Sequence, residues 1–246
     1  MNNIRLVLMY DGSGYFGFAE QKEVLTVSGE LKRSLKELVG EEVPLVGASR
    51  TDRGVHALGQ VINFKSGARL SPGDYFGALN FLLPPDIRVL KAEEVSSDFH
   101  ARFSAKGKEY RYSIFEGREV PFNLRDFSLH VRGDLNVGAM KEAAAYLVGE
   151  HDFTSFAQEI NGSPIRRIDS VEIAEKSDPM GRVLEFDFKG NSFLYKMIRA
   201  IMGTLLEVGR EKSGPEKVDE ILKAGDRRRA GATALPHGLC LMKVIY

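Results

Sequence analysis

The sequence predicts an α+β fold of two ferredoxin-like (split βαβ) units, with a joined, mainly antiparallel sheet flanked by helices. Three observations predict it: apolar runs that alternate as strands do, apolar stripes with helical spacing, and an order of strand, helix, strand, strand, helix, strand that occurs twice. The 246 residues, 43% hydrophobic and 28% charged, suffice for a folded core of this size. We place the join near residues 98–107, which gives an N-terminal unit over 1–104 and a C-terminal unit over 105–246.

In the first half, a nearly continuous apolar run from Ile4 to Tyr10 predicts a buried strand that ends at a glycine-rich turn. An apolar stripe that begins at Val27 predicts a helix, which Gly40 ends. A second helix begins at Ser71 and Pro72, a residue pair typical of a helix start. The strands expected here cover residues 4–10, 43–49, 60–65 and 87–95, and the helices cover residues 26–39 and 71–83.

The second half repeats this order with longer elements. Residues 183–189 alternate cleanly between apolar and charged side chains, which is typical of a strand with one buried face. Ser192 is placed to cap a long helix with an apolar stripe, and Gly209 lies at its end. The strands expected here cover residues 108–115, 165–176, 183–189 and 239–246, and the helices cover residues 136–147, 192–209 and 215–223.

Composition excludes several classes of function. Thirty-four Lys and Arg residues balance 34 Asp and Glu residues, so a site for a polyanion must be a local basic patch. Cys240 is the single cysteine, which points to a reducing compartment and hence to the cytoplasm. No apolar run is long enough to span a membrane, and the five histidines lack the close spacing of metal ligands. We therefore expect no membrane association and no metal.

The loop over residues 47–59 is the segment with the clearest chemical potential. It places Asp52 between Arg50 and Arg53, with small residues on both sides. Two neighbouring guanidinium groups would keep the carboxylate ionised, as a nucleophile or a base requires, and would also bind phosphate. The alternative is structural: Asp52 accepts turn hydrogen bonds, the arginines solvate the loop, and His56 satisfies backbone groups. The residues alone leave these two interpretations equal.

Blocks along nearly the whole chain decide between them. Together with the Arg50-Thr51-Asp52 loop and the Gly54-Val55-His56-Ala57 that follows it, they resemble the TruA-type tRNA pseudouridine synthases. Phe18-Ala19-Glu20 and Ser28-Gly29-Glu30 depart from the usual pattern of that family, which affects only peripheral contacts. The other blocks that carry the resemblance are residues 10–13, 99–105, 110–112, 151–156, 193–199, 203–209, 230–234 and 236–239.

The resemblance implies a role for several residues. Asp52 corresponds to the catalytic aspartate that drives cleavage of the uridine glycosidic bond, rotation of the base and rejoining through C5, without a cofactor. Whether it attacks the ribose, attacks the base or removes a ribose proton stays open. Arg199 corresponds to a basic residue that pairs with this aspartate. Arg50 corresponds to an arginine that either pairs with the aspartate or occupies the place of the target base before that base flips in. Tyr110 corresponds to the tyrosine that stacks on the target base, whereas Tyr112 is expected to be core.

The resemblance further implies a homodimer whose substrate is tRNA, at uridines 38, 39 and 40 of the anticodon arm. Arg53 and His56 flank the catalytic aspartate and are expected to contact the substrate. Three adjacent arginines in a loop gain little from packing and much from releasing counterions, so we expect them to bind RNA phosphate. The three are Arg227, Arg228 and Arg229; further basic candidates are Arg102, Lys106, Lys108, Arg111, Arg166 and Arg167.

Two rival functions are weaker. Residues 12–17 fit the pattern GxGxxG of nicotinamide-dependent oxidoreductases, but no helix is expected to begin at these glycines. The order of elements is also that of a non-catalytic RRM-like RNA-binding protein, in which Tyr110 and Tyr112 would stack on bases. The characteristic RNP1 motif of that module is missing from both expected positions, residues 59–64 and 183–189.

Overall fold

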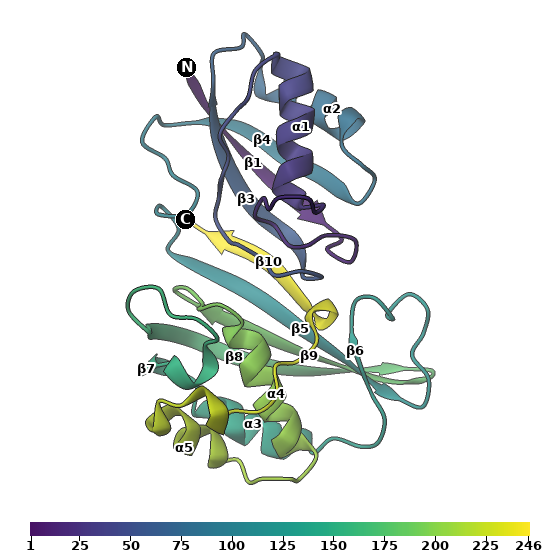
Figure 1. Cartoon of the computed structure of the whole chain (residues 1–246). Helices are drawn as coiled ribbons and strands as arrows, with labels where there is room; N and C mark the ends of the chain where they lie inside the picture. Colours follow the sequence, from purple (N-terminus) through teal and green to yellow (C-terminus); the bar gives the residue numbers. More distant parts are fainter. The chain divides into compact units, whose positions relative to one another are not determined.

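The computed structural model describes every residue from Met1 to Tyr246, and the chain divides into two compact units (Figure 1). Unit 1 comprises Met1–Lys106 and Cys240–Tyr246, and unit 2 comprises Gly107–Leu239. Each unit contains a mainly antiparallel sheet with helices against it, so the predicted α+β class is confirmed. None of the helices combines the length and the apolar sequence needed to cross a membrane.

The sheet of unit 1 has β1 at its centre. Strand β1 runs antiparallel to both β3 and β4. On its other edge, β3 pairs with β2 along one part of its length and with β10 along another. The order β4-β1-β3-β2 is that of a ferredoxin-like unit. Its strands are β1 (Asn2–Tyr10), β2 (Val46–Gly47), β3 (His56–Ser66), β4 (Ile87–Val95) and β10 (Leu239–Ile245).

Two helices cover one face of this sheet, α1 (Val27–Val39) and α2 (Pro72–Leu82) (Figure 1). Thr26 caps α1, since its side chain accepts a hydrogen bond from the N–H of Gly29. Ser71 and Asp74 form a capping box at the start of α2, with Pro72 in the first helical position as predicted. These local signals explain why the sequence alone located both helix starts.

Unit 2 is built on four antiparallel strands in the order β5-β9-β8-β7, with β6 parallel to β5. Figure 1 shows α3, α4 and α5 gathered on one side of these strands. The strands are β5 (Gly107–Gly117), β6 (Leu129–Val131), β7 (Gly149–Asp152), β8 (Ile165–Asp178) and β9 (Gly181–Gly190). The helices are α3 (Val137–Ala145), α4 (Met197–Gly209), α5 (Lys217–Ala224) and the 3₁₀ turns η1 (Thr154–Phe156), η2 (Arg227–Arg229) and η3 (Pro236–Gly238).

The structure differs from the sequence prediction in four elements. The strand expected over 43–49 is reduced to Val46–Gly47, since Pro44 has no N–H to give to a ladder. Helix α4 begins at Met197 and not at Ser192, because Lys196 adopts a left-handed conformation with φ of 60°. The short strands β6 and β7 were not predicted.

Candidate active site

Asp52 lies on the loop between β2 and β3, residues 48–55, which we call the aspartate loop. Its side chain is partly exposed, while those of Arg50 and Arg53 are exposed. The guanidinium of Arg53 lies 4.1 Å from the centroid of the Phe16 ring, which directs it along the surface of the neighbouring segment. The loop thus carries a partly exposed aspartate, with exposed arginines at residues 50 and 53.

The segment over residues 12–18 holds the aspartate loop by backbone contacts. The N–H of Phe18 donates to the carbonyl of Thr51 at 3.0 Å, and the N–H of Gly54 donates to the carbonyl of Tyr15 at 3.2 Å. Gly17 has a φ of 96°, and a Cβ there would lie 2.7 Å from the Thr51 carbonyl. The two segments therefore approach more closely than a side chain at residue 17 would permit.

A buried amide fixes the loop from the other side. Gln60 on β3 has no exposed surface, and its Oε1 accepts from the N–H of Ser49 at 3.2 Å while its Nε2 donates to the Ser49 carbonyl at 2.8 Å. The hydroxyl groups of Tyr10 and Thr51 lie 2.7 Å apart, and the Gln60 amide also donates to the Tyr10 hydroxyl at 3.4 Å. Ser49 and Thr51, on either side of Arg50, are thus held by side chains of the sheet.

His56 lies directly after the aspartate loop and is buried, with 4% exposure. Its Nδ1 accepts from the N–H of Gly12 at 3.1 Å and lies 3.1 Å from a carboxylate oxygen of Asp11. A Cβ on Gly12 would lie 2.1 Å from the carbonyl of Val55, so these segments are in close contact. His56 thus contributes to the packing between the aspartate loop and residues 11–12.

Two tyrosines of β5 have different surroundings in unit 2. Tyr110 is opposite Phe188 in the ladder, is 7% exposed, and meets the Phe193 ring edge-on with centroids 5.3 Å apart. Tyr112 is fully buried and its hydroxyl donates to the carbonyl of Leu235 at 2.8 Å. Burial raises the pKa of the Tyr112 phenol, and the nearby positive charge of Arg199 partly opposes that rise.

Arg199 lies in the first turn of α4, where its own backbone and side chain hold the segment over residues 230–234. Its Nε donates to the carbonyl of Ala234 at 2.8 Å, and the Ala234 N–H donates to the Arg199 carbonyl at 3.0 Å. Further along the helix, a Cβ on Gly203 would lie 1.7 Å from the carbonyl of Ala232. The orientation of Arg199 therefore depends on how closely this segment lies on α4.

The three adjacent arginines of η2 are not equivalent. The guanidinium of Arg227 donates to the carbonyls of Ala230 and Gly231 and to the Thr233 hydroxyl, the last at 2.8 Å. Arg228 forms an ion pair with Asp226 at 2.8 Å, and Arg229 is exposed. Arg227 thus holds its own loop together, which leaves Arg228 and Arg229 facing solvent.

The other basic candidates differ in the same way. Arg111 forms a two-point ion pair with Asp187, at 2.7 and 2.8 Å, and a second pair with Glu185 at 2.9 Å. Arg102 and Lys106 have exposed side chains in unit 1. Since a guanidinium already paired with two carboxylates binds phosphate weakly, Arg102 and Lys106 are better candidates for RNA contacts than Arg111.

Sequence reasoning missed the residues that position the aspartate loop. Gln60 was recognised only as part of a strand, and Tyr10 only as the end of another. A glutamine with Val61 and Ile62 directly after it, in a strand next to a charged loop, was the available signal, because a buried amide must find hydrogen-bond partners. Pairing Gln60 with Ser49 required the register between β3 and the loop, which the sequence does not contain.

The arrangement supports acid–base or nucleophilic chemistry on an anionic substrate. A partly exposed aspartate on a loop held by the sheet, with exposed arginines at residues 50 and 53, has the chemistry of a base or nucleophile, and these cations attract phosphate. No group of three or more His, Cys, Asp or Glu side chains is arranged to hold a metal ion. This loop on an α+β fold is the type of site found in enzymes that act on phosphate-bearing substrates.

Comparison with known proteins identifies the family. The model of the family described as tRNA pseudouridine synthase matches residues 6–104 and 143–246, and the chain belongs to that family. The match includes the aspartate loop, Arg199 and the η2 arginines, whereas Tyr110 lies between the two matched segments.

Full-length relatives agree with the family match. The chain is 46% identical to a tRNA pseudouridine synthase A of Moorella thermoacetica, over 99% of each chain. It is 43% identical to a protein of the same name from Acetivibrio thermocellus, over 100% of each chain. A binding-only RRM-like module is therefore not favoured.

Proposed function

We propose that this protein converts uridine to pseudouridine in tRNA, with Asp52 as the catalytic residue. Membership of the tRNA pseudouridine synthase family supports the reaction and the substrate class. The observation that carries the role of Asp52 is its partly exposed carboxylate on a loop held by Gln60, Gly17 and His56. A carboxylate held in this way has little conformational entropy to lose when the substrate binds.

The reaction is an isomerisation, so it needs no external atoms or electrons. The bond between C1′ of the ribose and N1 of the base breaks, the base rotates, and C1′ joins C5. The proton that leaves C5 is balanced by the proton that N1 gains. Asp52 acts as an ionised carboxylate, either as a nucleophile toward the ribose or the base, or as a base toward a ribose proton.

The roles proposed for Arg50, Arg199 and Tyr110 follow from the resemblance, and those for His56 and Arg227 follow from their own burial and hydrogen bonds. Arg50 and Arg199 balance the charge of Asp52 and of the displaced base, and Tyr110 stacks on the target base. Arg53 and the outward-facing arginines of η2 contact phosphate. His56, being buried, acts by holding the aspartate loop. Arg227 supports phosphate binding indirectly, because its hydrogen bonds to Gly231 and Thr233 fix the conformation of the loop that carries Arg228 and Arg229.

We propose the anticodon arm, at uridines 38, 39 and 40, as the target, and a homodimer as the active form. Both rest on the family resemblance. The chain has a single cysteine, Cys240, so it cannot form a disulfide within itself, which supports a cytoplasmic location.

The test is direct. Purified protein is incubated with unmodified tRNA transcripts in buffer that contains a chelator and no cofactor, and pseudouridine is mapped along the RNA. We expect pseudouridine at positions 38–40 only. Modification elsewhere in the tRNA would refute the anticodon target, and binding without modification would refute the enzyme. Light scattering of the same sample gives the number of subunits, for which we expect two.

A further inference from the structure

A short turn after β4 holds an aromatic ring out in solvent. Phe103 is 76% exposed, although phenylalanine is among the residues that protein cores bury most often. One face of its ring stacks on the imidazole of His100, with centroids 4.3 Å apart and planes inclined by 26°. We call residues 100–104 the aromatic turn. Single exposed apolar residues are common, but this one is fixed in place by a set of hydrogen bonds.

The turn is rigid because its own groups close it. Nδ1 of His100 accepts from the backbone N–H groups of Arg102 and Phe103, both at 3.2 Å. The N–H of His100 donates to the Ser104 hydroxyl at 3.1 Å, and the N–H of Ser104 donates to the His100 carbonyl at 2.9 Å. These bonds fix the His100 imidazole, and its ring supports that of Phe103 in a fixed orientation.

The middle of the turn is anchored to the sheet of unit 1. Ala101 is fully buried, its N–H donates to Oδ1 of Asn63 at 2.8 Å, and its carbonyl accepts from the Tyr246 hydroxyl at 2.7 Å. The Asn3 amide also donates to the carbonyl of Phe99 at 3.0 Å. The sheet thus holds the inside of the turn while Phe103 faces solvent, so a ligand that binds the ring need not order it first.

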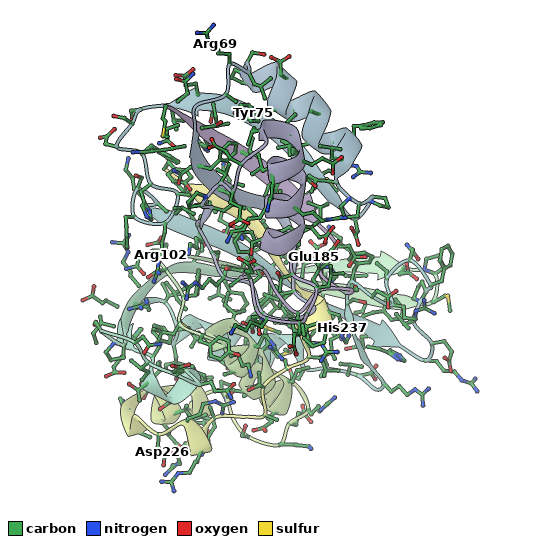
Figure 2. The ribbon with its side chains drawn as sticks, turned by 45° about the horizontal axis from the view of Figure 1, so that its top comes forward. Arg69, Tyr75, Arg102, Glu185, Asp226 and His237 are labelled. Carbon is green, nitrogen blue, oxygen red and sulfur yellow. The ribbon has the colours of Figure 1, made fainter.

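We propose that the aromatic turn is a stacking platform for an unpaired base of the tRNA, a proposal that rests on the proposed function. Unpaired RNA bases are recognised by stacking on aromatic rings and guanidinium planes. The Arg102 guanidinium is exposed, 5.7 Å from the centroid of the Phe103 ring, and Figure 2 labels Arg102 in unit 1. Arg102 and the exposed Lys106 supply positive charge for the flanking phosphates.

The base on this platform is not the uridine that reacts. Asn63 anchors the turn, whereas Thr51, next to Asp52, contacts the hydroxyl of Tyr10, whose ladder partner on β3 is Ala57. At about 3.3 Å per residue, the six residues between Ala57 and Asn63 span roughly 20 Å, more than the length of one nucleotide. Loss of the platform should therefore weaken tRNA binding and raise KM while kcat stays unchanged.

The test compares Phe103→Ala with Phe81→Ala, a matched control in which an 87% exposed phenylalanine of α2 in the same unit is removed. Binding of an unmodified tRNA transcript is measured by fluorescence anisotropy. We expect the Kd to rise about tenfold for Phe103→Ala, a change within the range of base–aromatic stacking, and not at all for Phe81→Ala. The salt dependence of binding should be unchanged, because no charge is removed.

Two further variants separate the effect of stacking on a π face from the effect of apolar volume. Phe103→Trp, which has a larger π face, should bind at least as tightly as the wild type. Phe103→Leu keeps apolar volume without a π face and should bind as weakly as Phe103→Ala. Full affinity in Phe103→Leu would overturn the platform, and so would Phe103→Ala binding as tightly as Phe81→Ala.

The alternative is that Phe103 contacts a second copy of the chain and not RNA. Light scattering tests this alternative. The subunit number should be the same for the wild type and Phe103→Ala. A change to monomers would overturn the platform in favour of a protein contact. Since the readout is binding, the test stays valid if the wild type binds tRNA without forming pseudouridine, a result that would refute only the proposed function.

Discussion

At the scale of single residues, the aspartate loop owes its conformation to side chains that lie outside it. Gln60 makes several of the hydrogen bonds that fix the loop, since its amide binds the backbone N–H and carbonyl of Ser49 and also donates to the Tyr10 hydroxyl. Because Gln60 is fully buried, none of these bonds can be replaced by water without opening the sheet. We therefore treat Gln60 as a positioning residue for Asp52.

Gln60→Leu removes this amide while it keeps much of the volume. The N–H and carbonyl of Ser49 lose their partners, so we expect stability to fall by about 1–3 kcal/mol. Pseudouridine formation should lose kcat more than it loses tRNA affinity, because Asp52 is displaced from the reacting atoms. The matched control is Gln21→Leu, in which the lost bond is an exposed one to the Phe16 carbonyl. Equal kcat in the two variants would show that Gln60 does not position the loop.

At the scale of elements, α4 and the segment over 230–234 form a closely packed pair on which the placement of Arg199 depends. Thr204 Oγ1 accepts from the N–H of Gly231 at 2.9 Å, next to the close approach at Gly203. The side chain and backbone of Arg199 bind the same segment at Ala234. A change that lifts the segment off the helix should therefore disturb Arg199 as well.

Gly203→Ala tests this packing. The new Cβ would lie 1.7 Å from the Ala232 carbonyl, so the segment must move. We expect a loss of about 1–3 kcal/mol in the free energy of unfolding. The matched control is Gly77→Ala on the exposed face of α2, where no atom lies within 4 Å of the new Cβ. This variant should gain up to about 1 kcal/mol in the free energy of unfolding. Thermal unfolding of both variants measures the difference, and the same sign in both would contradict the packing argument.

The turn between α5 and η2 carries a pH-dependent contact. The hydrogen-bonded guanidinium of Arg228 lowers the pKa of Asp226 to about 2. Figure 2 shows Asp226 at the outside of unit 2. Because the pKa is lower in the folded state, the contact stabilises the fold above pH values near 3.9, the usual aspartate pKa, and this stabilisation is lost as the pH falls toward 2.

An NMR titration of the side-chain carboxyl carbons reads this contact directly. The wild type should show a midpoint near 2 for Asp226. Arg228→Ala should raise that midpoint part of the way toward 3.9, since the backbone N–H of residue 228 still donates to the carboxylate. Arg229→Ala should have a smaller effect, because its charge is the last and smallest of the causes. A larger shift in Arg229→Ala would refute the assignment to Arg228.

At the scale of the whole molecule, a chain with no net charge has to bind a polyanion through local groups. The structure separates its arginines into two sets. Arg111, Arg182 and Arg227 are engaged within unit 2 by carboxylates or backbone carbonyls. Arg102 and Arg229 are exposed, so these two are better placed to contact RNA phosphate.

Much of the fold was readable from the sequence because its signals are local. Ser71 and Pro72 fix the start of α2, and Gly40, with a φ of 80°, ends α1 as predicted. The predicted start of α4, at Ser192, was wrong because nothing in the sequence indicates that Lys196 adopts a left-handed conformation. Phe193 lies before the helix and packs against Tyr110. The partner of Gln60 depends on how the loop lies against β3, and the partners of Arg227, three to six residues along the chain, depend on how η2 turns, neither of which the sequence pattern encodes.

The identity of Asp52 as the residue to test came from the sequence, since charge spacing and family resemblance both point to it. Its support could only come from the structure, because Gln60 and His56 on β3 and Gly17 in the segment over residues 12–18 hold the loop from two sides. The proposed function therefore depends on the carboxylate of Asp52 doing the chemistry on a loop that the rest of unit 1 holds still.

The most direct measurement is a single-turnover assay of Asp52→Asn on unmodified tRNA transcript, with Asp178→Asn at the β8–β9 hairpin as the control. The amide keeps the shape of the side chain but is neither a base nor a nucleophile. Wild type and Asp178→Asn should form pseudouridine at the same rate, whereas Asp52→Asn should form none and still bind tRNA with wild-type affinity. Pseudouridine formation by Asp52→Asn at a rate close to that of the wild type would contradict the account.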